Sequence, residues 1–256
     1  MDDLERIHDA LQKAAAAISP FVPGAVKADQ KPLGRGPVTE ADRAADRVLR
    51  EALQQHGEGW LSEESTDDLT RLQKQRVWVV DPLDGTLEFV AGIPEWCVSI
   101  ALVENGKAVA GGILNPSTGE VFLGSVAGGL TYNGKRTHAS ALTSLQGAVV
   151  LASRSEVKRG EWEVFRNAPV TVRPTGSVAY KLARVAAGLA DATWTLTPKS
   201  EWDVAAGVAL VQAAGGFAEC LDASGPTFNN PSPRLSGLIA GGMALREGIR
   251  ELLAGV

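Results

Sequence analysis

The sequence predicts an α/β protein with an antiparallel meander half followed by an alternating α/β half. Three observations carry this prediction: helical spacing of apolar residues early in the chain, Asn-Gly turns between β-rich runs, and later alternation of strand and helix patterns. The 256 residues suit one large domain or two small ones. The pattern changes near residue 145, so we expect an N-terminal α+β subdomain at 1–145 and a C-terminal α/β subdomain at 146–256.

The first half contains two predicted helices and several predicted strands. Apolar residues recur at helical spacing over residues 3–19 and again after Thr39, a candidate N-cap. Residues 20–37 are rich in Pro, Gly and Lys and predict a mobile surface loop. The predicted strands cover residues 76–80, 97–103, 108–114 and 120–123. Asn105-Gly106 predicts a hairpin between the second and third of these, and Asn133-Gly134 marks a further turn.

The second half alternates between the two patterns. Strands are predicted at residues 148–152, 170–173, 192–196, 217–221 and 237–240. Helices are predicted at residues 161–166, 178–187 and 204–214, and a separate terminal helix ends near residue 253. Gly215-Gly216 ends the third of these helices. Such alternation predicts layers of helices and sheet.

Composition excludes several functional classes. The net charge of −5 and the sequence pI near 5.3 disfavour nucleic-acid binding, which depends on clustered cations. No apolar run approaches the roughly 18 residues that span a membrane, and Met1-Asp2-Asp3 does not resemble a secretory signal. Cys97 and Cys220 lack metal-binding spacing, and three histidines are too few for a histidine-rich zinc site. We therefore expect a cytoplasmic protein that binds neither nucleic acid nor membrane.

The segment Asp81-Pro82-Leu83-Asp84-Gly85-Thr86 is the most informative part of the sequence. An apolar strand runs directly into two acids held by a proline and a glycine. Pro82 fixes φ and lacks an N–H, so we expect the chain to leave the sheet there. Gly85 permits positive φ or close approach to a ligand. The alternative is a simple Asx-turn at a strand end.

Further acids occur in two distant segments. Glu63-Glu64 follows Trp60-Leu61-Ser62, and Asp203 follows Trp202. Taken singly, the glutamates could lie in a solvated turn and Asp203 in the first turn of a helix. Taken together, the three segments would gather four or five carboxylates, which repel one another unless a cation such as Mg²⁺ binds them.

Thr39-Glu40-Ala41-Asp42 has two interpretations. It is similar to a capping box, with Asp in place of Glu or Gln. Alternatively, Asp42 orients the hydroxyl of Thr86. The local pattern does not decide between them.

Four motifs in order resemble the inositol monophosphatase family. They are Val38-Thr39-Glu40-Ala41-Asp42 (VTxxD), Glu63-Glu64-Ser65 (EES), Asp81-Pro82-Leu83-Asp84-Gly85-Thr86 (DP(I/L)DGT), and Trp202-Asp203-Val204-Ala205-Ala206-Gly207 with Gly215-Gly216 (WDxAAG…AGG). They extend over residues 38–216. Each is weak alone, but the set in this order is highly specific.

The resemblance implies a layered α-β-α-β-α sugar-phosphatase-like fold and a Mg²⁺-dependent, Li⁺-sensitive phosphomonoesterase with two or three Mg²⁺ ions. The metal ligands it implies are the side chains of Glu63, Asp81, Asp84 and Asp203 and the backbone carbonyl of Leu83. Asp42 and Thr86 would polarise the nucleophilic water, and Gly85 and Thr86 would offer backbone N–H groups to the phosphate. Homodimers are common in this family.

Several features resemble the 3'(2'),5'-bisphosphate nucleotidase branch. Leu87-Glu88-Phe89 follows the aspartate motif in the form typical of that branch, and Ser153-Arg154-Ser155 resembles its SRS element. Lys181 stands where inositol phosphatases usually carry an acid. Lys181, Lys199 and Arg154 are therefore candidates to bind a second phosphate. The alternatives are that Lys181 snorkels to the surface and that Lys199 lies in an exposed loop.

Two features bear on inositol 1-phosphate as the alternative substrate. Gly92-Ile93-Pro94 resembles an element of inositol phosphatases, but Leu196 replaces the glutamate expected to contact inositol. Lys31–Gly36 resembles an insertion just before the VTxxD motif, in the loop that helps to hold a third metal in this family. A further alternative is a non-catalytic protein that binds metal or a phosphosugar, although such a protein has no need for the Asp42–Thr86 pair.

Overall fold

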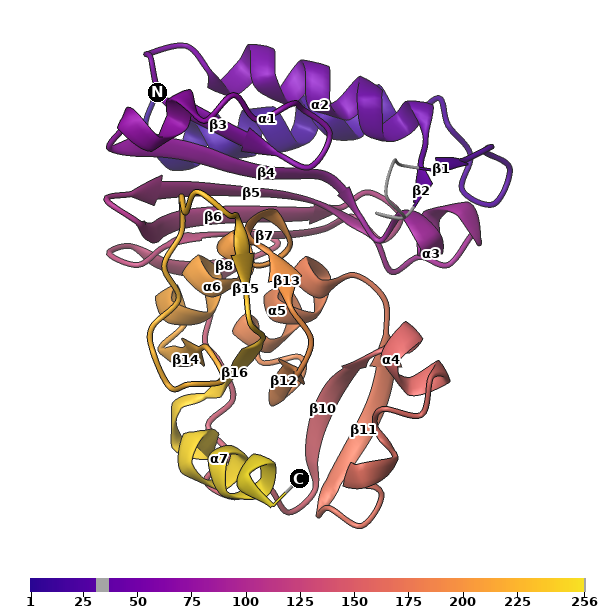
Figure 1. Ribbon diagram of the computed structural model, residues 1–256, viewed down its shortest axis with the longest axis vertical. Helices are drawn as coiled ribbons and strands as arrows, with labels where there is room; N and C mark the ends of the chain where they lie inside the picture. The colour runs from indigo at the N-terminus through magenta and orange to yellow at the C-terminus, as the bar shows by residue number, and fades with distance from the viewer. Residues whose placement is uncertain (31–36, 256) are drawn as a thin grey trace.

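A computed structural model of the chain describes residues 1–30 and 37–255. Helices, sheet, helices, sheet and helices follow one another along the long axis of the molecule (Figure 1). The predicted α-β-α-β-α layering is confirmed, and so is the order of an antiparallel meander followed by an alternating α/β half. No helix in the described ranges is both long enough and apolar enough to cross a lipid bilayer.

The first layer is a pair of helices, α1 (Asp3–Ile18) and α2 (Glu40–Leu53). Their apolar stripes pack on one face of the larger sheet, as the periodicity predicts. Thr39 is the N-cap of α2, as predicted. The loop predicted over residues 20–37 contains two paired strands of two residues each, β1 (Asp29–Gln30) and β2 (Pro37–Val38). The proposed insertion Lys31–Gly36 lies outside the described residues.

The larger sheet has the strand order β3-β4-β5-β6-β7-β8-β9. Its strands are β3 (Gly59–Ser62), β4 (Arg76–Asp84), β5 (Cys97–Glu104), β6 (Lys107–Asn115), β7 (Glu120–Ser125), β8 (Gly129–Tyr132) and β9 (Lys135–Thr137). Asn105 and Gly106 both have positive φ and form the predicted β5–β6 turn. The sequence patterns missed β3, which is short and buried throughout, and also β8 and β9. Only β3 and β4 pair in parallel in this sheet; the other described neighbours are antiparallel.

The expectation that the chain leaves the sheet at Pro82 is wrong. Asp81 pairs with Ser99 and Asp84 pairs with Cys97, so three steps along β4 match two steps along β5. This bulge accommodates a proline that cannot donate to the ladder, because it leaves the extra residue unpaired. The consequence is that both aspartates stay on a rigid strand.

The second half supplies the remaining layers. Helices α5 (Val178–Ala186) and α6 (Glu201–Ala213) lie between the two sheets, while α4 (Arg154–Lys158) and α7 (Arg246–Ala254) lie beyond the smaller sheet (Figure 1). That sheet has the order β11-β10-β12-β16-β14, with β10 (Ala148–Ser153), β11 (Val170–Thr175), β12 (Ala192–Thr195), β14 (Gly216–Glu219) and β16 (Leu238–Gly242). A separate pair joins β13 (Lys199–Ser200) to β15 (Arg234–Leu235).

One helix prediction in this half needs correction, and one helix was not predicted. The helix predicted at residues 161–166 is only a 3-10 turn, Glu163–Phe165, whose Phe165 packs with Trp162 and Trp194. The sequence patterns missed α4, a five-residue helix that Ser153 caps. Further 3-10 turns occur at Thr70–Gln73 and Met243–Leu245.

Helix α6 is held close to both of its neighbours. A Cβ on Gly111 of β6 would lie 2.7 Å from the carbonyl oxygen of Ala206, and one on Gly207 would lie 2.3 Å from Cβ of Leu182 in α5. Glycine is therefore needed at both positions for α6 to sit in its groove. Because this core joins residues from both halves, the subdomain boundary near residue 145 stays a prediction.

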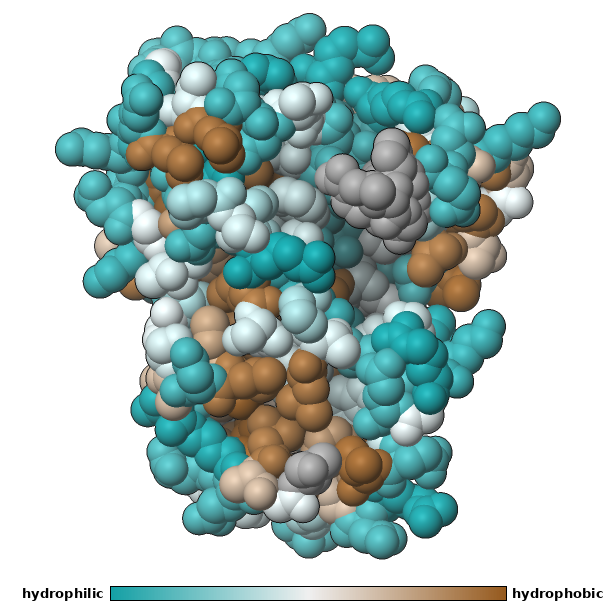
Figure 2. Space-filling view, in the orientation of Figure 1, coloured by the Kyte–Doolittle hydropathy of each residue, from teal (hydrophilic) through white to brown (hydrophobic). Residues whose placement is uncertain are grey.

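The surface seen in Figure 2 is mainly hydrophilic, with an apolar groove over the smaller sheet and α7. Leu196, Leu221, Ile239 and Leu253 line this groove. It shares no lining residue with the acidic pocket described next.

Candidate active site

Three acids from separate segments converge at the end of β4. Glu63 follows β3, Asp81 lies in β4, and Asp203 lies in the first turn of α6, and each contributes one oxygen to a group whose members are all within 4.8 Å of one another. The parallel pairing of β3 with β4 brings Glu63 and Asp81 to the same edge. Asp203 is oriented by the Ser200 backbone N–H, which donates to its Oδ2 at 3.1 Å.

The electrostatics of this acid cluster call for a cation. Burial raises the pKa of Asp81 well above its usual value, and the charges of Glu63, Asp84 and Asp203 raise it further. Burial, Asp84 and Glu63 likewise raise the pKa of Asp203. A set of carboxylate oxygens without nitrogen or sulfur ligands suits a hard cation such as Mg²⁺. The residues present therefore fit the metal that the sequence implied.

Asp84 lies beside this cluster but is partly committed elsewhere. Its Oδ2 accepts hydrogen bonds from Ser177 Oγ and from the backbone N–H of Ala179, both at 2.6 Å. Burial raises the pKa of Asp84, while these hydrogen bonds and the charge of Lys181 act in the opposite direction. Asp84 is thus tied to the start of α5 and is not one of the three acids whose oxygens converge.

The backbone between the two aspartates is also ordered. The Leu83 N–H donates to Asp81 Oδ1 at 3.0 Å, and the Leu83 carbonyl oxygen lies 3.2 Å from Thr86 Oγ1. Gly85 has φ near 97°, and a Cβ there would lie 2.9 Å from the Glu95 carbonyl oxygen. Only glycine fits this position, which leads into the short helix α3 (Thr86–Val90).

Asp42 fulfils both roles that the sequence left open. Its Oδ2 accepts from the Thr39 backbone N–H at 2.8 Å and from Thr39 Oγ1 at 2.6 Å, completing a capping box. Its Oδ1 accepts from Thr86 Oγ1 at 3.1 Å. One carboxylate therefore caps α2 and also contacts the threonine of the aspartate motif.

A pocket of about 250 Å³ opens beside these groups. It is lined by Pro37, Glu63, Asp84, Gly85, Thr86, Leu87, Glu88, Ser153, Ser155, Gly176, Ser177, Val178, Lys181 and Lys199. Most of the proposed substrate residues are among these, with Arg154 the exception. The Arg154 guanidinium instead pairs with Glu95, with Nη2 2.5 Å from Oε2.

Neither lysine of the pocket is the exposed surface residue that the sequence offered as an alternative. Lys181 is only 4% exposed, so it does not snorkel to the surface. Burial lowers its pKa, and the charges of Asp84 and Glu156 partly compensate. Lys199 is held by Glu156, with Nζ 3.1 Å from Oε1.

Sequence reasoning missed several supporting residues. Asp46 accepts hydrogen bonds from Ser62 Oγ at 2.5 Å and Ser65 Oγ at 2.7 Å, which flank Glu63-Glu64. Its position four residues after Asp42 places both on one face of α2, a signal that the helical pattern offered. Nothing local marked Glu156, because its partners Thr195 and Lys199 lie about 40 residues further along the chain.

Comparison with known proteins covers almost the whole chain. The model of the inositol monophosphatase family matches residues 3–253. An inositol-1-monophosphatase of Rhizobium meliloti is 31% identical over 225 residues, which cover 84% of this chain and 82% of the relative. The solved structure of extragenic suppressor protein suhB from Bartonella henselae is 32% identical, with a TM-score of 0.82 and 97% of each chain covered. That of CysQ from Bacteroides thetaiotaomicron is 27% identical, with a TM-score of 0.80 and 94% of this chain and 97% of that chain covered.

Proposed function

The chain belongs to the inositol monophosphatase family, whose members are hydrolases of phosphomonoesters, and we propose that it acts with Mg²⁺ on esters that carry a second phosphate. The favoured substrate is 3'-phosphoadenosine 5'-phosphate, which a 3'(2'),5'-bisphosphate nucleotidase converts to AMP and phosphate. On the sequence resemblance, we also propose inhibition by Li⁺ and a homodimeric state, and on the composition a cytoplasmic location.

The proposed metal ligands are the carboxylates that gather at the end of β4. They are Glu63, Asp81 and Asp203, whose oxygens converge, together with Asp84 beside them and the Leu83 carbonyl. Bound there, Mg²⁺ would supply an acidified water and neutralise charge on the phosphoryl oxygens. The raised pKa of Asp81 and of Asp203 supports this assignment, because like charges in a buried site need an opposing charge.

Asp42 and Thr86 are proposed to activate the attacking water by removing its proton. With the Thr86 hydroxyl donating to Asp42 Oδ1, its oxygen is left to accept a hydrogen bond from the attacking water. The proton that the water loses would pass to Thr86 Oγ1 as the hydroxyl proton of Thr86 passes to Asp42 Oδ1. The backbone N–H groups of Gly85 and Thr86 are proposed to bind the phosphate. The close packing of Gly85 against Glu95 would hold these N–H groups in place.

The position of Lys181 is the main support for a substrate with a second phosphate. Lys181 lines the pocket and is 4% exposed as a whole residue, and within residues 1–30 and 37–255 its ammonium group makes no hydrogen bond. Burying an unpaired ammonium group is costly, so the site favours an anion as its occupant. Lys199 adds a second positive charge to the same pocket, and Ser153 adds a hydroxyl. Arg154 contributes less than the sequence suggested, because Glu95 holds it.

Inositol 1-phosphate is the second candidate. The relative from Rhizobium meliloti is an inositol-1-monophosphatase, and Gly92-Ile93-Pro94 resembles an element of such enzymes. Glu88 also lines the pocket, and burial raises its pKa, so a hydroxyl-rich substrate could hydrogen-bond to it.

Substitution of Lys181 by methionine separates the two substrates. The charge-assisted contact should be worth about 1.5–3 kcal/mol, so Lys181→Met should lower kcat/KM for 3'-phosphoadenosine 5'-phosphate by roughly 10- to 150-fold. Hydrolysis of inositol 1-phosphate, which has no second phosphate, should change little. Methionine keeps the apolar stem, and Lys158→Met on the exposed end of α4 is the matched control.

Phosphate release with Mg²⁺ is the measurement. A wild-type preference for inositol 1-phosphate, unchanged by Lys181→Met, would establish the second candidate instead. Binding of Mg²⁺ and substrate without phosphate release from any ester would indicate a non-catalytic metal- or phosphosugar-binding protein.

A further inference from the structure

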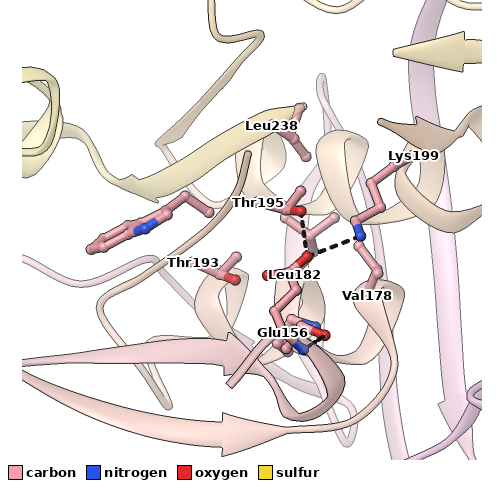
Figure 3. A pocket seen from close by; sticks show the side chains of 10 residues that line it. Glu156, Val178, Leu182, Thr193, Thr195, Lys199 and Leu238 are labelled. Atoms are coloured by element: carbon pink, nitrogen blue, oxygen red, sulfur yellow. Dashed lines mark hydrogen bonds and ion pairs between the residues drawn. The ribbon is translucent and has the colours of Figure 1, made fainter. Parts of the chain in front are cut away.

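Glu156 is a buried carboxylate beneath the pocket that no step above uses. It lies in α4 and is 3% exposed. Its Oε1 accepts from Thr195 Oγ1 at 2.8 Å, from Thr197 Oγ1 at 3.2 Å and from Lys199 Nζ at 3.1 Å. Figure 3 shows Thr195 and Lys199 converging on this side chain from the opposite wall. Its Oε2 accepts from the Trp162 indole N–H at 3.2 Å.

These partners keep Glu156 negatively charged. Burial acts to raise its pKa, but the hydrogen bond from Thr195, the charge of Lys199 and the hydrogen bonds from Trp162 and Lys199 together lower the pKa of Glu156 below its usual value. Apolar residues of similar volume commonly replace a buried ion pair without loss of stability. A carboxylate fully satisfied at this depth therefore points to a role that needs its charge.

The charge of Glu156 bears on both lysines of the pocket. Lys181 and Lys199 line the same wall, and the charge of Lys199 acts to lower the pKa of Lys181. The groups acting on Lys181 are the acids Asp84, Glu88 and Glu156 and the cation Lys199. Without Glu156, the two ammonium groups would share a confined site with less opposing negative charge.

Glu156 also sets the direction of the Lys199 ammonium group. Within the described ranges, Lys199 Nζ donates to Glu156 Oε1 and to Thr197 Oγ1, both at 3.1 Å. An ammonium group has three N–H donors, so one is left for a ligand in the pocket that Lys199 lines. The side chain is thereby held ready for an anion.

We propose that Glu156 is a positioning residue for the second phosphate of the substrate. It fixes the Lys199 ammonium group at the pocket wall, and its negative charge opposes the positive charges of Lys181 and Lys199. This inference rests on the proposed function, since it presumes a substrate with a second phosphate. Glu156 itself touches neither the substrate nor the reacting atoms.

The test compares KM with kcat for Glu156→Gln, which keeps the shape of the side chain and removes its charge. For 3'-phosphoadenosine 5'-phosphate we expect KM to rise roughly tenfold or more, the scale of one charge-assisted contact, with kcat within about twofold. Trp162→Phe is the matched control, because it removes the hydrogen bond on the far oxygen of Glu156. It should leave KM for this substrate unchanged.

A double-mutant cycle separates positioning from a general loss of packing. In a Lys199→Met background, Glu156→Gln should raise KM much less than in the wild type, because the group that it positions is gone. Equal effects in both backgrounds, or an unchanged or lowered KM in the single variant, would overturn the inference. If Glu156→Gln does not fold, Glu156→Asp is measured in the same cycle, and the same coupling is expected.

Failure of this inference differs from failure of the proposed function. If Lys181→Met weakens the preference for the bisphosphate while Glu156→Gln does not, only the role of Glu156 is wrong. If the wild-type enzyme shows no preference for the bisphosphate over 3'-AMP, both proposals fall.

Discussion

Two regions of this enzyme bury acids and treat them in opposite ways. In the acid cluster, Asp81 is surrounded by other carboxylates, and its pKa is raised by burial and by their charges. Near the far end of the molecule, Glu219 of β14 accepts from Arg246 Nε at 2.8 Å and Arg250 Nε at 2.5 Å, both on α7. Burial acts to raise the pKa of Glu219, but the two arginines outweigh it and the pKa is lowered.

The two regions differ in how the negative charge of the buried acids is balanced. The Glu219 clamp joins a strand to a helix, and its charges are balanced within the protein. The acid cluster is held together by the backbone and by hydrogen bonds while its charges repel one another. Acids with perturbed pKa values that gather in a cleft are typical of functional sites.

Removing one charge from the acid cluster should have the largest effect. We expect Asp81→Asn to reduce Mg²⁺-dependent phosphate release to background and to raise the Tm of the metal-free protein, because one source of repulsion is lost. The amide oxygen can still accept from the Leu83 N–H, so the backbone should stay in place. Turnover is measured with excess Mg²⁺, and Tm with EDTA. Near-normal turnover would show that Asp81 does not bind the metal.

The two threonines that share Asp42 provide a matched pair of variants. Thr86→Ala should lower kcat by roughly 10²–10⁴ with little change in substrate affinity, since it removes the hydroxyl but keeps the backbone N–H. Thr39→Ala removes the contact to the other oxygen of the same carboxylate and should cost about 1 kcal/mol of stability as a lost N-cap. Steady-state kinetics and thermal melting of both proteins check this. Similar kcat losses in the two variants would refute a special role for Thr86.

Asp46 tests whether the cluster depends on its support from α2. Asp46→Asn weakens the hydrogen bonds to Ser62 and Ser65 and should lower Mg²⁺ affinity by roughly 10- to 100-fold. Calorimetric titration of the metal-free protein with Mg²⁺ measures this without reference to turnover. An unchanged affinity would mean that the loop of Glu63 is ordered by its other contacts.

The smallest effect is expected at the Glu219 clamp, where pH responses also differ. Glu219→Gln should lower Tm by roughly 2–4 °C and leave Mg²⁺ affinity unchanged. Because the folded pKa of Glu219 lies below the usual 4.5, its stabilisation is present above pH 4.5 and lost as pH falls through the lowered value. The raised pKa of Asp81 acts in reverse: the metal-free protein should lose stability as pH rises above 3.8.

Melting curves in EDTA between about pH 3.5 and about pH 8 distinguish the two regions, because this range brackets the titration of carboxyl groups. Asp81→Asn should reduce the loss at high pH, and Glu219→Gln should reduce the loss at low pH. Parallel curves for all three proteins would contradict the contrast between the regions.

Local patterns in the sequence were enough for most elements and for the residues proposed to bind metal. Helical spacing located α1 and α2, and Asn105-Gly106 located a hairpin, because these signals act over a few residues. The aspartate motif and Asp203 stood out because acids beside buried apolar residues are unusual. The same local reasoning missed β3, α4 and the bulge after Asp81, where pairing with another strand or packing decided the outcome.

What the sequence by itself determined, then, was the family resemblance, the order of elements and the acids; the tertiary structure decided how side chains distant in the chain act on each other. It brought Glu63, Asp81 and Asp203 together, turned Arg154 toward Glu95, and buried Lys181 beside the pocket. The physical reason is range: turn and helix signals depend on near neighbours, whereas burial and charge depend on every group packed nearby. Only the folded chain therefore shows that Asp42 can cap a helix and contact Thr86 with different oxygens of one carboxylate.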